Sequence, residues 1–438
     1  MLRPLCRYSS AITDLRRLGG AAEITSLSVD GIEGIYTSQT KKLWIDRLHR
    51  DKKALEGSAL PTPSPKPPKT LSISYPFSSS PILQEQYRNP WSYVRIGKVL
   101  EDLDSLAGNI AYEHCDDGKP DTRPPMLVTA SVDAIQLRKR LAIETDMTIQ
   151  GQVVWTGSSS MDIRMELLQG ETDEPSLVAL FTFVARDPLS GRAMTINSLD
   201  PATETDRARF AERQQIAQQR RAARKATATT LPTDESSLLW LFMRQRSSAQ
   251  MGWAEERLAE ARAMMDLPAL AHGDAVLMHR TKLHNTFTCQ PQQRNMHGRV
   301  FGGFLMRRAF ELAFATSYLF AGSRPTFTQV GEITFKRAVE VGDLLRLHST
   351  VLYTHEDSST GQGVMHIQIV ALVTQPEHVR SDESNTFHFV FSTALDEKQR
   401  GLQHGKAAPR KLKRVLPGTK EEALSILQFA PESGLPNC

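Results

Sequence analysis

The chain has 438 residues, of which 40% are hydrophobic and 23% are charged, and its formal net charge is +4. This composition is typical of a globular protein with two or three domains, and so small a net charge does not indicate nucleic acid or an anionic membrane as a partner. The four cysteines lie far apart and form no C-x-x-C pair, which argues against a disulfide framework and a zinc site. We therefore expect a reducing compartment.

The first residues are rich in arginine and poor in acids, since MLRPLCRYSSAITDLRRLGG contains four Arg and a single Asp. This composition predicts a mitochondrial transit peptide over residues 1–30 and a location in the mitochondrial matrix; a disordered basic N-terminus is the alternative. Residues 31–84 are expected to be an N-terminal extension with a linker, because 57-GSALPTPSPKPPKT-70 contains five prolines. No later segment reaches the roughly 18 to 20 uninterrupted apolar residues of a membrane span, so we expect no stable membrane insertion.

Residues 85–205 are predicted to form a first domain of mixed type. A helix comes first, and four segments rich in apolar and β-branched residues then predict strands. These four segments are 126–137, 145–157, 159–169 and 176–187.

The segment 206–270 is expected to be a helical linker, because the polar stretch 202–226 is rich in Ala, Gln and Arg and contains neither Gly nor Pro. A nucleic-acid-binding arm is the alternative for this basic helix. No aromatic interleaving or known motif accompanies the charges, so we expect a solvated connecting helix and no nucleic acid partner.

Residues 271–400 repeat the order of the first domain, with a Gly-containing start, an apolar helix and then predicted strands at 326–354, 363–375 and 386–393. A basic C-terminal tail over 401–438 follows. Placing Asn89 over Asn295 gives six identities across the 24 positions 89–112, where chance gives about one or two. The pattern predicts two copies of one α+β domain.

The stretch 295-NMHGRVFGGFLMRRAFELA-313 places three glycines directly before an apolar, helix-forming segment. Glycine permits a close approach to the main chain, and a helix start offers unpaired N–H groups with partial positive charge. Such a place suits a developing oxyanion. A tight turn into a buried helix explains the same residues.

Two segments carry a resemblance to a known family. N-x-x-G-x-V-F-G-G-x-L-M-R-x-A-F-E-L-A, which starts at Asn295, and 93-YVRIGKVLEDLDSLAGNIAYEH-114 resemble the double hotdog acyl-coenzyme A thioesterases, and in particular their mitochondrial type. The resemblance implies a tandem hotdog, in which each of two long central helices is wrapped by an antiparallel sheet. It also implies hydrolysis of acyl-coenzyme A to free fatty acid and coenzyme A without a cofactor, and assembly into a homo-oligomer.

The family uses an acid on one central helix and an Asn from the facing unit, and two acids compete for the first role. At about 100° per residue, Asp104 lies roughly 40° beyond the apolar arc of its helix and is flanked by small residues. A carboxylate in such a place is costly unless it is used or paired. Glu311 lies with Arg307 on the polar side of the second helix, where an ion pair also explains it. We favour Asp104 and keep Glu311 as the alternative.

The resemblance assigns further roles around these acids. Asn295 would hold the attacking water or the thioester, and Gly302 and Gly303 would stabilise the oxyanion through their N–H groups. His297 is expected either to contact the substrate or to pack in the turn, and Asn89 would serve a second site as Asn295 serves the first.

Basic side chains are candidates for the phosphates of coenzyme A, although a role as ordinary surface charges explains them equally well. They are Arg138, Lys336 and Arg337. Two other functions stay open on sequence grounds. A hydratase or dehydratase of the same fold would use a His with a carboxylate, and a protein that only binds acyl-coenzyme A would have lost its catalytic residues.

Overall fold

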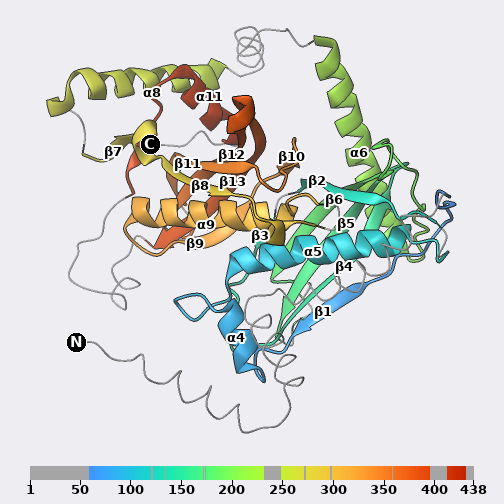
Figure 1. Cartoon of the computed structure of the whole chain (residues 1–438). Coiled ribbons are helices and arrows are strands. Elements are labelled where there is room, and N and C mark those ends of the chain that lie inside the picture. The colour runs from blue at the N-terminus through green and yellow to red at the C-terminus, as the bar shows by residue number, and fades with distance from the viewer. Residues whose placement is uncertain are drawn as a thin grey trace.

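The computed structural model describes residues 59–119, 122–133, 135–170, 172, 174–230, 248–270, 273–295, 298–357, 359–394 and 412–430 (Figure 1). The predicted transit peptide and most of the predicted N-terminal extension lie outside the described residues.

Twelve strands form one continuous sheet, in which every pair of neighbouring strands is antiparallel. The strand order is β1-β4-β5-β6-β2-β10-β13-β12-β11-β8, and the short strands β3 and β9 bridge β6 to β13 beside this path. The strands are β1 (Leu71–Tyr75), β2 (Met126–Val132), β3 (Ile135–Leu137), β4 (Met147–Thr156), β5 (Ser160–Gln169), β6 (Leu177–Arg186), β8 (Leu283–Thr288), β9 (Thr326–Val330), β10 (Ile333–Phe335), β11 (Leu344–Asp357), β12 (Gln362–Gln375) and β13 (Arg380–Ala394).

Two helices of 20 residues each, α5 (Ile96–Cys115) and α9 (Gly302–Ala321), run across the sheet and contact each other (Figure 1). Helix α5 packs on β4 and β5, and α9 packs on β11, β12 and β13. The apolar side chains of both helices are largely buried in the main hydrophobic core. Strand β6 and the first six residues of β4 alternate buried and partly exposed side chains, as expected for a sheet with one covered face.

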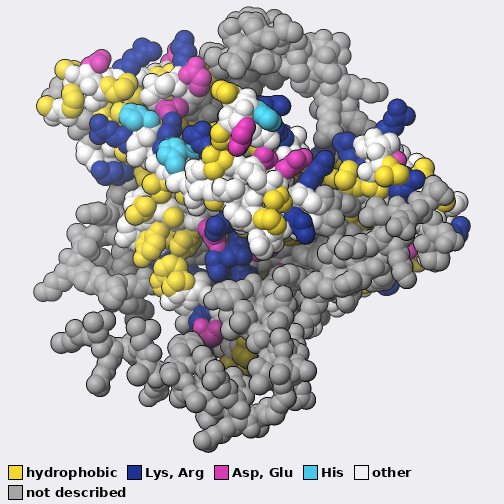
Figure 2. All heavy atoms as spheres, in the orientation of Figure 1, with side chains coloured by type: hydrophobic (Ala, Val, Ile, Leu, Met, Phe, Trp, Pro, Cys, Tyr) yellow, Lys and Arg dark blue, Asp and Glu magenta, His cyan; other side chains and the backbone are white. Residues whose placement is uncertain are grey.

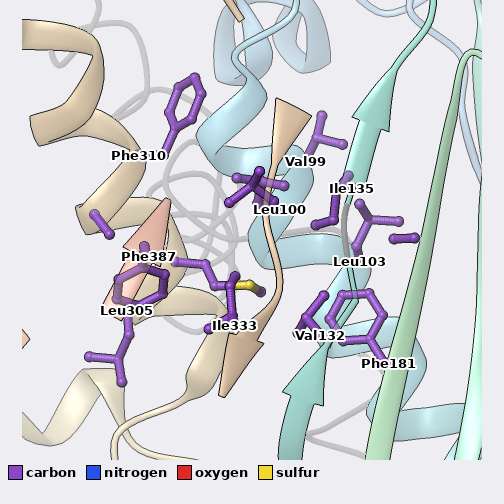
Figure 3. Close-up of a cluster of buried hydrophobic side chains, with 14 of the residues drawn as sticks. Val99, Leu100, Leu103, Val132, Ile135, Phe181, Leu305, Phe310, Ile333 and Phe387 are labelled. Atoms are coloured by element: carbon purple, nitrogen blue, oxygen red, sulfur yellow. The ribbon is translucent and has the colours of Figure 1, made fainter. Parts of the chain in front are cut away.

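The two halves of the sheet meet where β2 pairs with β10 and β3 pairs with β9. In this seam Val132 lies opposite Ile333, and Ile135 lies opposite Val330. All four side chains are buried in the main hydrophobic core. Figure 3 shows three of them beside residues of α5, so the core continues from one half into the other.

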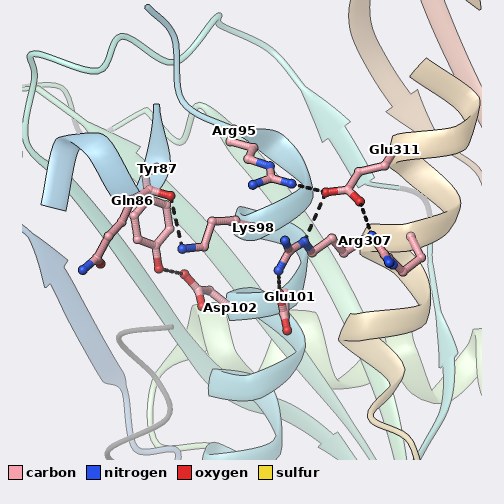
Figure 4. Close-up of polar contacts among 9 residues, drawn as sticks. Gln86, Tyr87, Arg95, Lys98, Glu101, Asp102, Arg307 and Glu311 are labelled. Carbon is pink, nitrogen blue, oxygen red and sulfur yellow. Dashed lines mark hydrogen bonds and ion pairs between the residues drawn. The ribbon is translucent and has the colours of Figure 1, made fainter. Parts of the chain in front are cut away.

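The polar side of α5 is buried rather than solvated. Asp102 accepts hydrogen bonds from the hydroxyl groups of Tyr75, at 3.0 Å, and of Tyr87. Lys98 donates to the Gln86 carbonyl oxygen at 3.2 Å (Figure 4). Strand β1 and helix α4 (Pro81–Tyr87) supply the two tyrosines and Gln86. Strand β1 and the first residues of α4 lie in the predicted extension 31–84, so folded structure begins before the predicted boundary at residue 85.

The linker helix α6 (Glu204–Thr230) is held against the outer surface of the sheet by its arginines. Arg213 pairs with Asp133 at 3.0 Å and with Asp162 at 2.7 Å, and Arg220 pairs with Asp133 at 2.8 Å. Arg220 also reaches Glu332, at 3.4 Å, in the second half of the sheet. The basic residues of this helix therefore join the two halves through ion pairs.

The C-terminal segment contains structure that the sequence analysis did not predict. Strand β14 (Arg414–Leu416) pairs in parallel with β7 (Ala275–Leu277), and α11 (Lys420–Phe429) packs against α8 (Ser248–Asp266). Thr419 caps α11 by accepting a hydrogen bond from the Glu422 N–H at 3.2 Å. The short 3₁₀ helices are η1 (Pro268–Leu270), η2 (Met278–Thr281), η3 (Pro291–Gln293) and η4 (Pro376–His378).

Acidic and basic side chains are mixed over the described part of the face that Figure 2 shows. Within the described ranges, no helix combines the length and apolar character needed to cross a bilayer. Nowhere in that part of the chain do three or more His, Cys, Asp or Glu side chains gather closely enough to hold a metal ion.

Candidate active site

Asp104 lies in the middle of α5 and is completely buried. Its Oδ2 atom accepts a hydrogen bond from the Gly303 backbone N–H at 2.6 Å, and its Oδ1 atom accepts one from the Thr129 hydroxyl at 3.0 Å. The two donors come from α9 and β2, so both halves of the chain hold this carboxyl group in place.

Burial raises the pKa of Asp104 to about 7, although the hydrogen bonds from Thr129 and Gly303 lower it in part. The physical cause is the loss of hydration, which disfavours the ionised form. A carboxyl group that titrates near neutral pH can both take up and release a proton under physiological conditions. This is the property expected of a general base or acid.

The start of α9 lies directly against Asp104. A Cβ atom on Gly302 would lie 3.1 Å from the Asp104 Oδ2 atom, and one on Gly303 would lie 3.0 Å from the Glu101 Cα atom. The N-cap residue Phe301 makes no side-chain cap, which leaves the first N–H groups of α9 to other partners. The two glycines therefore allow α5 and α9 to approach closely enough for the Gly303 N–H to reach the carboxylate.

Asn295 lies in a tight turn just before α9. Its N–H donates to the Arg299 carbonyl oxygen at 2.6 Å, and its Oδ1 atom accepts from the Arg299 N–H at 3.1 Å. Asn295 and Asp104 line the same cavity, which has a volume of about 110 Å³. The structure therefore brings together the predicted acid and the predicted amide, although they belong to different halves of the chain.

The other predicted substrate contacts divide between this cavity and the surface. Arg337 lines the cavity and also forms an ion pair with Asp382. Lys336 pairs with Glu383 at 2.6 Å, and neither Arg138 nor Lys336 is among the residues that line the cavity. His297, which was predicted to contact the substrate or to pack in the turn, lies outside the described residues.

Thr129 is the residue at this site that sequence reasoning missed. Its only signal in the sequence is a hydroxyl side chain within the apolar strand 126-MLVTASV-132. That signal does not show which helix the strand packs against, and Thr is also common in ordinary strands.

Glu311 is bound within a network of arginines between the two helices (Figure 4). It pairs with Arg307 at 3.2 Å, with Arg308 at 3.1 Å and with Arg95 of the other half. Arg307 also pairs with Glu101 at 2.9 Å. Burial acts to raise the pKa of Glu311, but Arg307 and Arg95 outweigh it and hold the pKa below its usual value. This carboxylate is therefore ionised and forms ion pairs with three arginines.

Comparison with known proteins places the chain in a family. Acyl-coenzyme A thioesterase 2, chloroplastic, from Humulus lupulus is 42% identical over 409 residues, which are 90% of this chain and 89% of that protein. Acyl-coenzyme A thioesterase 4, mitochondrial, from the same organism is 42% identical over 90% of this chain and 73% of that protein. The chain belongs to the acyl-coenzyme A thioesterase family.

Other proteins are more distantly similar to the chain. The human acyl-coenzyme A thioesterase 9, mitochondrial, is 33% identical over 76% of this chain and 73% of its own length. Among solved structures, an acyl-CoA hydrolase from Staphylococcus aureus is 23% identical over 36% of this chain and 87% of that chain, with a TM-score of 0.30. No family model matches the chain. The family resemblance predicted from the two helix segments is thus confirmed.

Proposed function

We infer that this chain hydrolyses acyl-coenzyme A to a free fatty acid and coenzyme A. Family membership supports the activity, since relatives that match most of the chain are named as acyl-coenzyme A thioesterases. The observation that supports this active site is the buried carboxyl group of Asp104. Thr129 and Gly303 hold this group by hydrogen bonds, and Asn295 lines the same cavity.

In the proposed mechanism, ionised Asp104 takes a proton from the attacking water and returns it to the coenzyme A thiolate as the tetrahedral intermediate collapses. Alternatively, Asp104 attacks the thioester carbonyl carbon itself and expels the thiolate, and water then hydrolyses the resulting anhydride. Asn295 holds the water or the thioester in the cavity. Because the Gly303 N–H already donates to Asp104, its role is to position the carboxylate. The Gly302 N–H at the start of α9 is then the donor for the oxyanion of the tetrahedral intermediate.

The architecture supports a tandem hotdog, with domains over about 85–205 and 271–400. Each half contributes one 20-residue helix to a shared antiparallel sheet. Each helix is preceded by the same turn: the Asn89 N–H donates to the Tyr93 carbonyl oxygen at 2.8 Å, as the Asn295 N–H does to that of Arg299 at 2.6 Å. Matching hydrogen bonds at matching positions are what two copies of one fold would show.

We propose that the protein is located in an organelle. The Arg-rich start of the sequence favours the mitochondrial matrix. Relatives carry both chloroplastic and mitochondrial names, so the family alone does not choose between these two organelles.

The test of the proposed function is thiol release from a panel of acyl-coenzyme A esters. We expect Asp104→Asn to lower kcat by about 100-fold or more, the usual scale for loss of a positioned acid or base, with little change in KM. Asn295→Ala should have a similar effect. Glu311→Gln is the comparison, because that carboxylate is already occupied by arginines, and it should retain turnover.

The reverse pattern, in which Glu311→Gln is inactive and Asp104→Asn is near normal, would place the reaction at Glu311 and Asn89. Equal partial losses in both variants would indicate two equivalent sites. The absence of thiol release from every ester would refute the proposed activity itself.

A further inference from the structure

The cavity at Asp104 follows helix α5 toward the C-terminal end of that helix. Asp104, Gly108 and Tyr112 line the cavity from α5, at intervals of four residues. Residues four apart lie on one face of a helix, so these three form one row, which spans about 12 Å along the helix axis. Gly108 has no side chain and leaves the middle of the row open, whereas Tyr112 places a ring at its end.

Strand β2 runs beside this row and lines the same cavity with residues 126–129. The Thr129 hydroxyl donates to Asp104 at 3.0 Å, and two residues earlier in the strand the Leu127 N–H donates to the Tyr112 hydroxyl oxygen at 3.5 Å. The strand therefore leads from Tyr112 back to Asp104, and these two side chains mark the ends of one channel between helix and strand.

The mouth and the interior of the cavity differ in exposure. Ala338 is exposed at the mouth, and Asn295 and Arg299 are partly exposed there. In the interior, Tyr112 and Leu127 are only 4% and 5% exposed. A charged coenzyme group favours the mouth, where water is present, and an apolar acyl chain favours the buried interior.

The volume of the cavity, about 110 Å³, limits the acyl chain that it can hold. An apolar cavity of about 150 Å³ accommodates one benzene molecule, which has six carbons. We propose that Tyr112 closes the acyl end of the site and restricts the substrate to acyl chains of fewer than about six carbons. This inference rests on the proposed function, because it places the thioester carbonyl group at Asp104.

A further void lies beyond Tyr112. Cys115, which follows Tyr112 by about one turn of α5, lines this void together with Pro125. Met126, the residue after Pro125, lines the Asp104 cavity. The two spaces are therefore neighbours, with Tyr112 and Met126 in the wall between them. Removal of the Tyr112 ring should lengthen the acyl cavity toward Cys115.

Steady-state thiol release from straight-chain acyl-coenzyme A esters of increasing length tests this inference. We expect wild-type kcat/KM to be about tenfold or more lower for the octanoyl than for the butyryl ester, because the additional methylene groups find no room. Tyr112→Ala should raise the octanoyl-to-butyryl ratio of kcat/KM by about tenfold or more. Tyr318→Ala is the matched control and should leave the ratio unchanged. Tyr318 occupies the equivalent position in α9, is 39% exposed and lies outside the cavity.

Gly108→Ala tests the inference in the opposite direction. This substitution places a methyl group in the cavity one turn before Tyr112, so kcat/KM should fall for the butyryl ester relative to the acetyl ester. Alanine is favoured over glycine within a helix, and we therefore expect this variant to fold even if Tyr112→Ala does not. Circular dichroism checks the folding of both variants.

Equal kcat/KM of the wild-type chain for butyryl and octanoyl esters would overturn the inference, and so would an unchanged ratio in a folded Tyr112→Ala variant. If Tyr112→Ala is unfolded, an unchanged butyryl-to-acetyl ratio in Gly108→Ala would overturn it.

Calorimetric titration with S-alkyl-coenzyme A thioethers, which cannot be hydrolysed, separates this inference from the proposed function. No thiol release from any ester, together with tighter binding of the butyl than of the octyl thioether, would refute the proposed function and leave the limit on chain length standing. Thiol release that is equally fast from butyryl and octanoyl esters would do the opposite. No thiol release and equal binding of both thioethers would refute both.

Discussion

Asp104 owes its proposed reactivity to burial, and this has a direct consequence for the dependence of the reaction on pH. Its pKa is raised to about 7 by burial, and the proposed base or nucleophile is the ionised form. We therefore expect kcat/KM to fall tenfold per pH unit below about pH 7 and to level off above it. Initial rates between pH 5 and 9 measure this. A profile that stays level down to pH 5 would show that Asp104 is ionised there, and that burial does not control the reaction.

The same shift predicts an effect on stability. Because the pKa of Asp104 is higher in the folded chain than its usual value of 3.8, the unfolded chain loses this proton first as pH rises. The cost of burying the group therefore grows from about pH 4 to about pH 7 and is complete above pH 7. Asp104→Asn removes the titration, so its gain in thermal midpoint over wild type should be larger at pH 8 than at pH 5. An equal difference at both pH values would contradict the raised pKa.

At the scale of elements, the first turn of α9 controls how the two helices fit together. A Cβ atom on Gly303 would lie 3.0 Å from both the Cα atom and the carbonyl oxygen of Glu101. These are backbone atoms of α5, so no side-chain rotation relieves the contact. Gly303→Ala should therefore push the helices apart, lengthen the hydrogen bond to Asp104 and lower kcat by about one to two orders of magnitude. Enzyme assays and thermal unfolding of the variant measure both effects.

Gly252→Ala provides the control for this prediction. Gly252 lies in α8, and a Cβ atom there would meet no other atom within 4 Å. Alanine favours a helix by about 1 kcal/mol relative to glycine, so this variant should be at least as stable as wild type and fully active. If Gly303→Ala behaved in the same way, the close approach of α9 would not matter for the reaction.

Sequence patterns predicted the elements well where one periodicity covers a long segment. The predicted strands at 145–157 and 159–169 correspond to β4 and β5. Sequence patterns failed to predict short elements. Strand β14, for example, has three residues and is stabilised by pairing with β7. Such a segment has too few residues to show a period, and tertiary contacts determine its structure.

For the whole molecule, the limit of sequence reasoning is the joining of the two halves. Helical periodicity separates Asp104 from both the apolar and the polar side of α5, but it does not identify its partners. Thr129 reaches the carboxylate because β2 packs on α5, and Gly303 reaches it because α9 packs against α5. These contacts join residues far apart in the chain. The family resemblance predicted an Asn from the facing half, and the structure adds the two residues that hold the acid.

The placement of Asp104 and Asn295 in one cavity of a single chain makes a prediction about mixed assemblies. The family resemblance implies a homo-oligomer. Asp104→Asn chains and Asn295→Ala chains can therefore be expressed together with different affinity tags, and assemblies that contain both can be purified. Every site in the purified mixed assembly then carries one of the two defects, because both residues come from the same chain. We expect thiol release to stay at the level of the single variants. Recovery of up to about one half of wild-type turnover would instead show that the working site forms between chains, because in a dimer with one chain of each kind one of the two such sites combines the intact Asp104 and the intact Asn295.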